Sequence, residues 1–276
     1  VGCSSKPTTM KDREGNEFNV PKQVNTIIST APSNTEVLVA LGLADKLVAV
    51  DKYSVDVEGV SSDITKIDFR NPDAEKIISL KPDIVIASGH NKVGDEDPFA
   101  LIKEAGIPVA YIPSSYSIDE IYGDIEFIAS LTNTEKKGKE LVDSMKKEVE
   151  KVKAIGDKIA DKKNVYFEIG AGSGLYTFGN GTFLNELIET VGAKNIFENE
   201  EGWISPTAEA IIDANPDVII TNAGYMENPT EEIKSRDAWE NINAIKNNEV
   251  YLVDQNASSR PSQNVIKALE QMAKAV

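Results

Sequence analysis

Two stretches of this 276-residue chain have closely similar sequences, and this internal repeat limits the possible folds more than any other feature. Residues 71–88 read NPDAEKIISLKPDIVIAS and residues 205–222 read SPTAEAIIDANPDVIITN, so the copies align without a gap at an offset of 134. Each copy reads as a short helix with a proline in its first turn, where the missing N–H costs little. A second proline then precedes a β-branched run that is typical of a strand buried on both faces. The repeat therefore predicts two equivalent α/β lobes.

The remaining hydrophobic pattern alternates strands with helices in both halves of the chain. The expected strands cover residues 26–29, 48–50, 109–112, 165–169 and 250–253. The expected helices include 182–191, 262–275 and one that begins near Ser33 or Asn34, a good N-cap pair, and stops at Gly42. Strands that alternate with helices imply a mostly parallel sheet in each lobe, in a Rossmann-like arrangement.

A long amphipathic helix is expected between the two lobes, within residues 134–163. Its apolar residues recur at helical spacing, namely Leu141, Met145, Val149, Val152, Ile155 and Ile159. A helix of about 25 residues is about 37 Å long at 1.5 Å per residue, which suits a rigid spacer. The predicted division is an N-terminal tether at 1–20, a lobe at 21–133, the helix at 134–163 and a second lobe at 164–276.

Composition excludes several classes of function. With 29 Lys and Arg against 45 Asp and Glu, the net charge is −16, which argues against partners that are nucleic acids or anionic lipid surfaces. No apolar run approaches the roughly 20 residues of a membrane-spanning helix. One cysteine and one histidine exclude a disulfide framework and the usual zinc or iron–sulfur sites, so we expect no protein-bound metal.

The glycine-rich stretch 170–174, GAGSG, is the one feature that suggests an enzyme. It follows an expected strand, as a dinucleotide-binding loop does, but the spacing G-x-G-x-x-G would require glycine where Leu175 stands. Residues 176–179 also do not open a helix. We therefore expect no catalysis, and a nucleotide-cofactor enzyme stays a remote alternative that a titration with NAD would test.

The N-terminal residues V-G-C-S-S resemble the end of a bacterial lipoprotein signal. In that class the cysteine, here Cys3, becomes the acylated first residue of the mature protein. Attached lipid would then hold the chain at the outer face of the bacterial cell membrane, with the anchor as its only membrane contact.

The opening segment IISTAPSNTEVLVALGL, the two repeat copies and the central helix together resemble the substrate-binding proteins of ABC importers for iron–siderophores, haem and cobalamin. The resemblance extends over nearly the whole chain from Val24 onward. It implies two lobes joined by one long helix, with a ligand held between them, and a monomer that docks on a permease dimer carrying ATPase subunits. In that family a glutamate of each lobe forms salt bridges with permease arginines, and Glu75 and Glu209 match those positions.

The resemblance also implies which side chains contact the ligand. The matching positions are Tyr53, Phe69, Tyr176, Trp203 and Arg260. Ser33 and Asn34, at a helix start, could offer N–H groups to an anion. Tyr116, Tyr225 and His90 are weaker candidates that follow strand ends, and His90 is read as an ordinary loop histidine.

Aromatic faces suit a large planar or apolar-rimmed ligand, and an arginine can hold a carboxylate, phosphate or chelate oxygen. We expect a ferric-siderophore-type iron complex, and no cofactor besides this ligand. A corrinoid such as cobalamin is the alternative, because Tyr53, Phe69, Trp203 and Arg260 resemble cobalamin receptors in position. Haem comes third, with a tyrosine rather than His90 as the more credible iron ligand.

Overall fold

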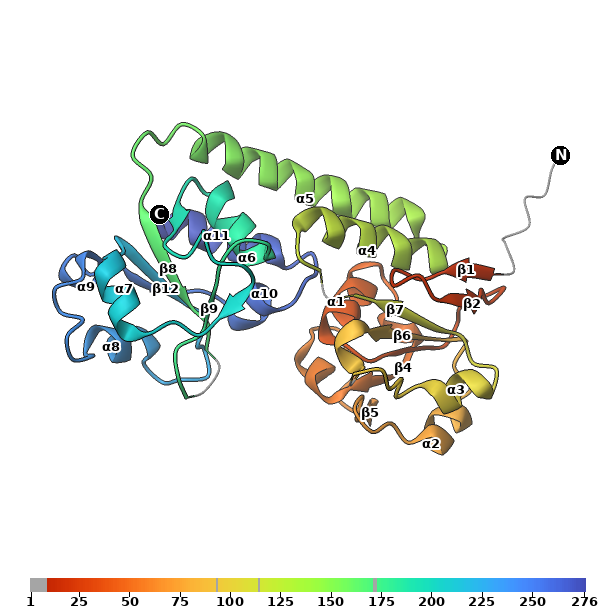
Figure 1. Cartoon of the computed structure of the whole chain (residues 1–276). Coiled ribbons are helices and arrows are strands. Elements are labelled where there is room, and N and C mark those ends of the chain that lie inside the picture. The colour runs from red at the N-terminus through yellow and green to blue at the C-terminus, as the bar shows by residue number, and fades with distance from the viewer. Residues whose placement is uncertain (1–8, 93, 114, 171–172) are drawn as a thin grey trace. The chain divides into compact units, whose positions relative to one another are not determined.

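The computed structural model describes residues 9–92, 94–113, 115–170 and 173–276, so the predicted lipid-attachment residue Cys3 lies outside the described part. The chain divides into two compact units, which are considered separately below (Figure 1). Unit 1 comprises Val1–Ser114 and Glu120–Val142, and unit 2 comprises Ser115–Asp119 and Asp143–Val276.

Unit 1 is built on a five-stranded parallel sheet. Its strands are β3 (Ile27–Ser29), β4 (Leu47–Asp51), β5 (Thr65–Ile67), β6 (Ile84–Ser88) and β7 (Val109–Ile112). They are ordered β5-β4-β3-β6-β7, so the chain adds strands on one side of β3 and then returns to the other side. In such a sheet the carboxyl ends of the strands at the reversal, here β3 and β6, are where ligands bind most often.

Short helices cover the sheet of unit 1. The helices are α1 (Pro32–Ala40), α2 (Ala74–Ser79) and α3 (Ala100–Glu104), with the 3₁₀ turns η1 (Ala44–Lys46), η2 (Lys52–Asp56) and η3 (Gly89–Asn91). Ile77 of α2 and Ile102 of α3 pack with alternate strand residues in one fully buried cluster, while α1 contacts β3 and β6. The β-branched runs predicted as two-sided strands are confirmed, since every residue of β6 is buried.

An antiparallel hairpin of β1 (Thr9–Lys11) and β2 (Glu17–Asn19) precedes this sheet. Its turn binds the edge strand β7, because the Asp12 carboxylate accepts a hydrogen bond from the Tyr111 N–H at 2.9 Å and the Arg13 N–H donates to the Tyr111 carbonyl at 3.2 Å. Arg13 also pairs with Asp124 of α4 (Ile118–Leu131) at 2.9 Å. The hairpin thus covers part of a sheet edge that would otherwise offer unpaired backbone groups.

Unit 2 repeats the arrangement with a four-stranded parallel sheet. Its strands are β8 (Asn164–Glu168), β10 (Lys194–Asn195), β12 (Val218–Thr221) and β13 (Val250–Leu252), in the order β10-β8-β12-β13. A separate antiparallel pair joins β9 (Thr177–Phe178) to β11 (Trp203–Ile204). The prediction of a mainly parallel α/β sheet in each half of the chain is confirmed.

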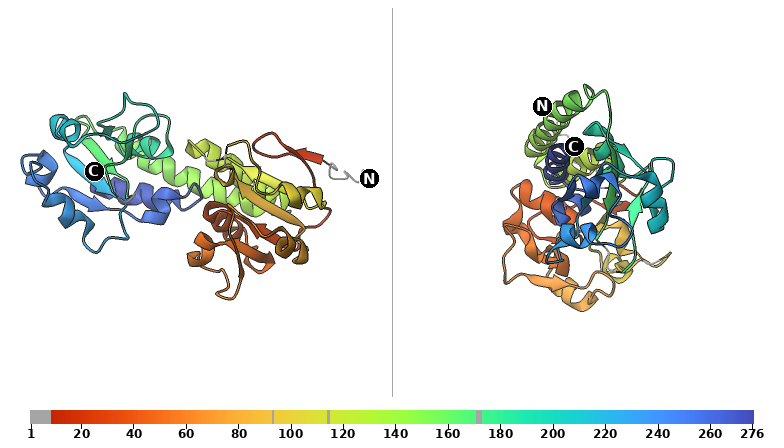
Figure 2. Two further views of the ribbon diagram at one scale, coloured as in Figure 1. Left: turned by 60° about the horizontal axis from the view of Figure 1, so that its bottom comes forward. Right: turned by 90° about the vertical axis from the view of Figure 1, so that its left-hand side faces the viewer.

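Helices pack on both faces of this second sheet (Figure 2). They are α6 (Phe183–Thr190), α7 (Ala208–Ala214), α8 (Pro229–Lys234), α9 (Asn243–Lys246), α10 (Gln255–Ser259) and α11 (Val265–Ala275). Ile211 of α7 and Ile233 of α8 share a buried cluster with strand residues, whereas α11 contacts β12 and α6. The prediction for α6 is correct to one residue at each end, but α11 begins at Val265, later than the predicted 262.

The two repeat copies adopt matching structures, with one correction to the prediction. Pro72 and Pro206 do not lie in the first helical turn; each precedes the N-cap of its helix, which is Asp73 in α2 and Thr207 in α7. Both N-cap side chains accept a hydrogen bond from the backbone N–H three residues later, at 3.2 and 3.1 Å. Each proline therefore restricts the backbone conformation of the chain just before the N-cap and does not take part in the first turn of the helix.

The shared aspartate of the repeat has the same structural role in both units. Asp83 accepts hydrogen bonds from the backbone N–H groups of Asn25 and Thr26, at 2.7 and 3.1 Å, just before β3. Asp217 accepts one from Asn164, at 3.0 Å, where β8 begins. Each aspartate therefore joins its own strand to the beginning of the neighbouring parallel strand.

The central helix α5 spans Glu135–Gly156 and is shorter than the predicted 134–163. Its buried residues are also partly different from those expected. Val142, Met145 and Val152 are buried, whereas Ile155 is 62% exposed. The helix ends where Gly156 lies against the backbone of residues 190–192, and a Cβ at this position would come within 2.6 Å of the Thr190 carbonyl oxygen.

Candidate functional site

At the carboxyl end of the unit 1 sheet, buried polar side chains hold the loops that follow the strands. Thr35 donates to the Ser29 hydroxyl at 2.8 Å and lies 2.8 Å from the Ser54 hydroxyl, which in turn donates to Asp51. Asp51 also accepts a hydrogen bond from the Tyr53 N–H at 3.1 Å and so caps η2. Because each buried polar group has a partner, these loops hold defined positions.

Two of the predicted ligand-contact aromatics meet in this region. Tyr53 is 54% exposed, while Phe69 is only 6% exposed, and their ring centroids lie 6.2 Å apart. Two exposed cations accompany the rings: the Lys52 ammonium lies 5.1 Å from the Tyr53 centroid, and the Arg70 guanidinium lies 5.8 Å from the Phe69 centroid. Tyr53 thus offers an open aromatic face, and Phe69 supports it from within the unit.

Ser33 and Asn34 occupy different positions from those predicted. The N-cap of α1 is Ala31, with Pro32 in the first turn, so Ser33 and Asn34 lie inside the helix instead of capping it. Both are buried, and the Asn34 amide donates to the Ala87 carbonyl of β6 at 3.3 Å. This bond gives Asn34 a structural role, and anion binding at these two residues stays a prediction.

In unit 2 the predicted aromatic Tyr176 directly precedes β9, and Trp203 is the first residue of β11. Trp203 is opposite Phe178 in the strand register, 53% exposed, with its ring centroid 5.8 Å from that of Phe178. Tyr176 is 38% exposed, and its carbonyl accepts a hydrogen bond from the Ile169 N–H at 2.9 Å. This bond holds the segment that carries Tyr176 beside the carboxyl end of β8.

A strand, β9, follows the glycine-rich stretch where a dinucleotide-binding loop would be followed by a helix. This agrees with the prediction that the stretch is not a dinucleotide loop.

The other predicted contacts follow strand ends or short helices. Tyr225 is 56% exposed and lies near Gly170, whose N–H donates to the Asn222 side chain at 2.8 Å. Arg260 is half-buried at the end of α10, and its N–H donates to the Asn256 carbonyl at 3.0 Å. Tyr116 is 56% exposed and precedes α4.

His90, the weakest of these candidates, belongs to η3.

Glu75 and Glu209 hold equivalent positions in the two units. Each is exposed and is the second residue of its helix, α2 or α7. A carboxylate in the first turn is favoured by the helix dipole, and neither side chain is needed as the cap. The pair therefore presents one accessible negative charge per unit at matching places.

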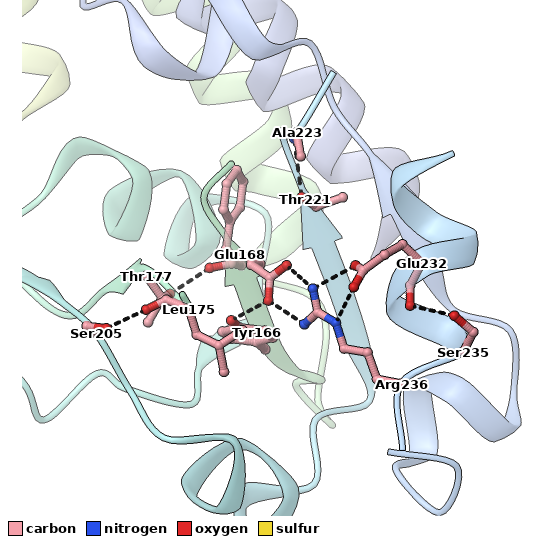
Figure 3. A network of polar contacts seen from close by, with 11 residues as sticks. Tyr166, Glu168, Leu175, Thr177, Ser205, Thr221, Ala223, Glu232, Ser235 and Arg236 are labelled. Carbon is pink, nitrogen blue, oxygen red and sulfur yellow. Dashed lines mark hydrogen bonds and ion pairs between the residues drawn. The ribbon is translucent and has the colours of Figure 1, made fainter. Parts of the chain in front are cut away.

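An ionic network at the end of β8 was not predicted. Figure 3 shows Arg236 reaching two carboxylates: it donates to both oxygens of Glu168, at 2.7 and 2.8 Å, and to Glu232 of α8, at 3.0 and 2.8 Å. The Tyr166 hydroxyl donates to Glu168 at 2.9 Å. A glutamate at the end of an otherwise apolar strand was the available signal, because a buried carboxylate requires a cationic partner.

Proton affinities follow from this geometry. Burial lowers the pKa of the Arg236 guanidinium, but its hydrogen bonds to Glu168 and Glu232 outweigh burial and raise that pKa above its ordinary value. Burial, together with the neighbouring Glu168 carboxylate, raises the pKa of the Tyr166 hydroxyl. Arg236 therefore stays a cation near neutral pH, and the Tyr166 hydroxyl stays protonated and able to donate.

Among the residues that the structure describes, no group of three or more His, Cys, Asp or Glu side chains is arranged to hold a metal ion. No helix there combines the length and apolar character that crossing a membrane requires.

Comparison with known proteins places the chain in a family. Residues 27–257 match the family described as periplasmic binding protein. The uncharacterized ABC transporter substrate-binding lipoprotein YvrC of Bacillus subtilis is 35% identical over 275 residues, which cover 98% of this chain and 85% of the relative. A vitamin B12-binding protein of Vibrio parahaemolyticus is 25% identical over 249 residues, 89% of this chain and 87% of the relative.

A solved structure agrees with these matches. It is the crystal structure of a possible iron-binding (periplasmic solute-binding) protein from Staphylococcus epidermidis, which is 34% identical, has a TM-score of 0.81, and aligns over 92% of this chain and 98% of that chain. These relatives are named for binding and transport, not for catalysis. The chain therefore belongs to the periplasmic binding protein family.

Proposed function

We propose that this chain is the extracytoplasmic substrate-binding component of an ABC importer, and that it captures a ferric-siderophore-type iron complex and delivers it to the permease. Family membership and the B. subtilis relative support the transport role. The observation that carries the ligand class is the exposed Tyr53 ring at the end of the unit 1 sheet, which is backed by the buried Phe69 and bordered by the cations Lys52 and Arg70.

The cations are informative because the chain as a whole carries a charge of −16. Lys52 and Arg70 nevertheless both lie beside aromatic rings, 5.1 Å from Tyr53 and 5.8 Å from Phe69. An open ring bordered by positive charge suits a ligand that is both anionic and apolar, such as a ferric chelate with phenolate or carboxylate oxygens. In unit 2, Trp203 and Tyr176 add exposed ring area.

A corrinoid is the second candidate. It is favoured by the V. parahaemolyticus relative, which is named a vitamin B12-binding protein. A corrin ring would stack on an exposed aromatic ring such as Tyr53 without needing the cations. Haem is the third candidate, with an exposed tyrosine such as Tyr176 as the possible iron ligand.

Docking and anchoring complete the proposal. Glu75 and Glu209 pair with arginines of a two-fold permease that carries the ATPase subunits, and the binding protein acts as a monomer. Cys3 carries lipid and holds the chain at the outer face of the cell membrane. The word lipoprotein in the name of the B. subtilis relative supports this last point.

The deciding experiment is a set of fluorescence-quenching titrations with ferrichrome, a ferric catecholate, haemin and cyanocobalamin. We expect the anionic ferric catecholate to bind more tightly than the uncharged ferrichrome, haemin or cyanocobalamin, and substitution of Lys52 and Arg70 by Gln to weaken that binding about tenfold or more. Preference for cyanocobalamin, unchanged in the double variant, would favour the corrinoid instead. If none of the four binds while NAD does, the transport proposal fails.

A further inference from the structure

The ionic network of unit 2 has no part in the function proposed so far. Its central residue, Glu168, ends β8, one of the two strands at the reversal of the sheet order, and its side chain is only 10% exposed. Arg236 binds both of its oxygens and links it to Glu232, while Tyr166 donates to it from within the core (Figure 3). The Arg236 guanidinium also lies 4.6 Å from the centroid of the buried Trp239 ring.

Stability alone does not explain such a network. Removing two charges from water costs free energy that their attraction only partly returns, and apolar residues of similar shape often give an equally stable protein. A rigid bidentate pair does, however, fix the direction of the groups around it better than apolar packing does. What the network positions therefore depends on which segments contact the end of β8.

Direct contacts connect the end of β8 to Tyr176. Glu168 is followed by Ile169, whose N–H donates to the Tyr176 carbonyl at 2.9 Å. The Thr177 hydroxyl donates to the Phe167 carbonyl, on the other side of Glu168 along the strand, at 2.6 Å (Figure 3). Any change in the direction of β8 at this point moves the segment that carries the Tyr176 ring.

Trp203 lies on a second segment, which contacts the Tyr176 segment at two points. Leu175 packs against the core cluster that contains Tyr166 and Trp239, and its carbonyl accepts a hydrogen bond from the Ser205 hydroxyl at 2.7 Å. Strand β11, where Trp203 lies, then pairs with β9. The network, the end of β8 and the two exposed rings thus form one continuous set of contacts.

We infer that Glu168 and Arg236 are positioning residues that hold Tyr176 and Trp203 in the orientation that binds ligand. This inference rests on the proposed function, since it assumes that these rings contact the ligand. Ligand affinity would then depend on the ionic network even though no ligand touches it, because rings held in place before binding lose less conformational freedom on binding.

The test removes the network without leaving buried groups unpaired. The triple variant Tyr166→Phe/Glu168→Leu/Arg236→Met replaces the buried polar atoms by apolar ones, and the Glu232 side chain, 42% exposed, stays hydrated. A second variant, Arg236→Lys, keeps the charge but cannot form the bidentate pair. The matched control is Arg13→Met/Asp124→Leu, which removes the partly buried ion pair of unit 1.

The first measurement needs no ligand. The chain contains two tryptophans, so 5-fluorotryptophan labelling gives two fluorine NMR signals, and Trp203→Phe identifies the signal of Trp203. We expect that signal to shift or split in the triple variant and in Arg236→Lys, with far-UV circular dichroism unchanged. The control should leave it in place.

The second measurement is the dissociation constant of whichever of ferrichrome, the ferric catecholate, haemin or cyanocobalamin binds the native protein. We expect the triple variant to bind it about tenfold more weakly, and the control within a factor of about two. An unchanged Trp203 signal, or unchanged affinity in the variants, would overturn the inference. If the triple variant does not fold, Arg236→Lys decides. If none of the four probes binds native protein, the proposed ligand classes fail, and the fluorine signal alone decides positioning.

Discussion

Among single residues, Trp203 offers the most direct test of the ligand surface. Its ring is 53% exposed and is supported at its edge by Phe178, so removing it should change little inside unit 2. We expect Trp203→Ala to weaken binding of the preferred probe by about 1–3 kcal/mol, because a stacked aromatic is a typical energetic centre of a binding surface. Isothermal titration calorimetry measures the effect, with Ile155→Ala, which removes an exposed apolar side chain of α5, as control. An unchanged dissociation constant would remove Trp203 from the site.

The sequence indicated which aromatic residues to consider but not how exposed each one is. Phe69 and Trp203 each lie three residues before the first proline of a repeat copy. Trp203 is 53% exposed whereas Phe69 is buried against Tyr53, because exposure depends on which loop packs beside the ring. The partners Glu168 and Arg236 are 68 positions apart, and no local pattern reveals their pairing.

Asp97 provides a prediction about pH. Burial raises the pKa of its carboxyl, but hydrogen bonds from Lys103, Tyr111 and the Phe99 N–H outweigh burial and lower that pKa below its ordinary value. A lowered pKa in the folded state stabilises the protein above about pH 4, the unfolded value, and this contribution is lost as pH falls through the folded value.

We therefore expect Asp97→Asn to lower the free energy of unfolding by about 1–3 kcal/mol at pH 7. The difference from native protein should shrink as pH falls below about 4, where the carboxyl of the unfolded chain becomes protonated, and should be lost below the lowered pKa of the folded carboxyl. Urea unfolding followed by circular dichroism at several pH values measures both. The exposed neighbour Asp95 supplies the control variant Asp95→Asn. A deficit that stays constant down to pH 2 would contradict the assignment.

At the scale of elements, the repeat predicted most of the architecture. The two copies share strand, helix and even a left-handed residue at the end of each helix, Lys81 with φ 50° and Asn215 with φ 47°. Asparagine adopts the left-handed conformation readily and lysine does not. Only the sequence of the second copy therefore indicated a left-handed residue at the end of its helix. The limits of α5 were missed for a different reason: the helix stops where its backbone meets residues 190–192, a contact that depends on tertiary structure.

That contact yields a prediction about Gly156. An alanine in a helix normally stabilises it relative to glycine, by up to about 1 kcal/mol. Here the added methyl would lie 2.6 Å from the Thr190 carbonyl oxygen and 2.8 Å from the Gly192 nitrogen, both backbone atoms that cannot easily move. We expect Gly156→Ala to lower the free energy of unfolding by about 1–3 kcal/mol. Urea unfolding measures it, with the exposed Ser144→Ala on the same helix as control; a gain in stability would refute the close packing.

At the scale of the whole molecule, the duplicated lobe has a consequence that neither copy has alone. In each unit the strand order reverses at the central strands, whose carboxyl ends are the expected place for a ligand. Each unit also carries one exposed glutamate at the second position of the equivalent helix. Within each unit, the glutamate proposed for docking and the aromatic residues proposed for ligand contact lie on different segments. Ligand binding and docking can therefore be changed independently of each other.

This independence allows the docking proposal to be tested in cells. We expect the double variant Glu75→Lys/Glu209→Lys to abolish uptake of the preferred probe, because two attractive charges become repulsive toward the permease arginines. Its dissociation constant for the purified protein should stay within a factor of about two of the native value. The matched control is Glu104→Lys/Glu240→Lys, which changes one exposed acid in each unit and alters the net charge by the same amount. Uptake is followed with radioactively labelled ligand in cells whose own receptor has been deleted. Normal uptake by the Glu75/Glu209 variant, or equal loss in the control, would show that the two glutamates have no specific part in docking.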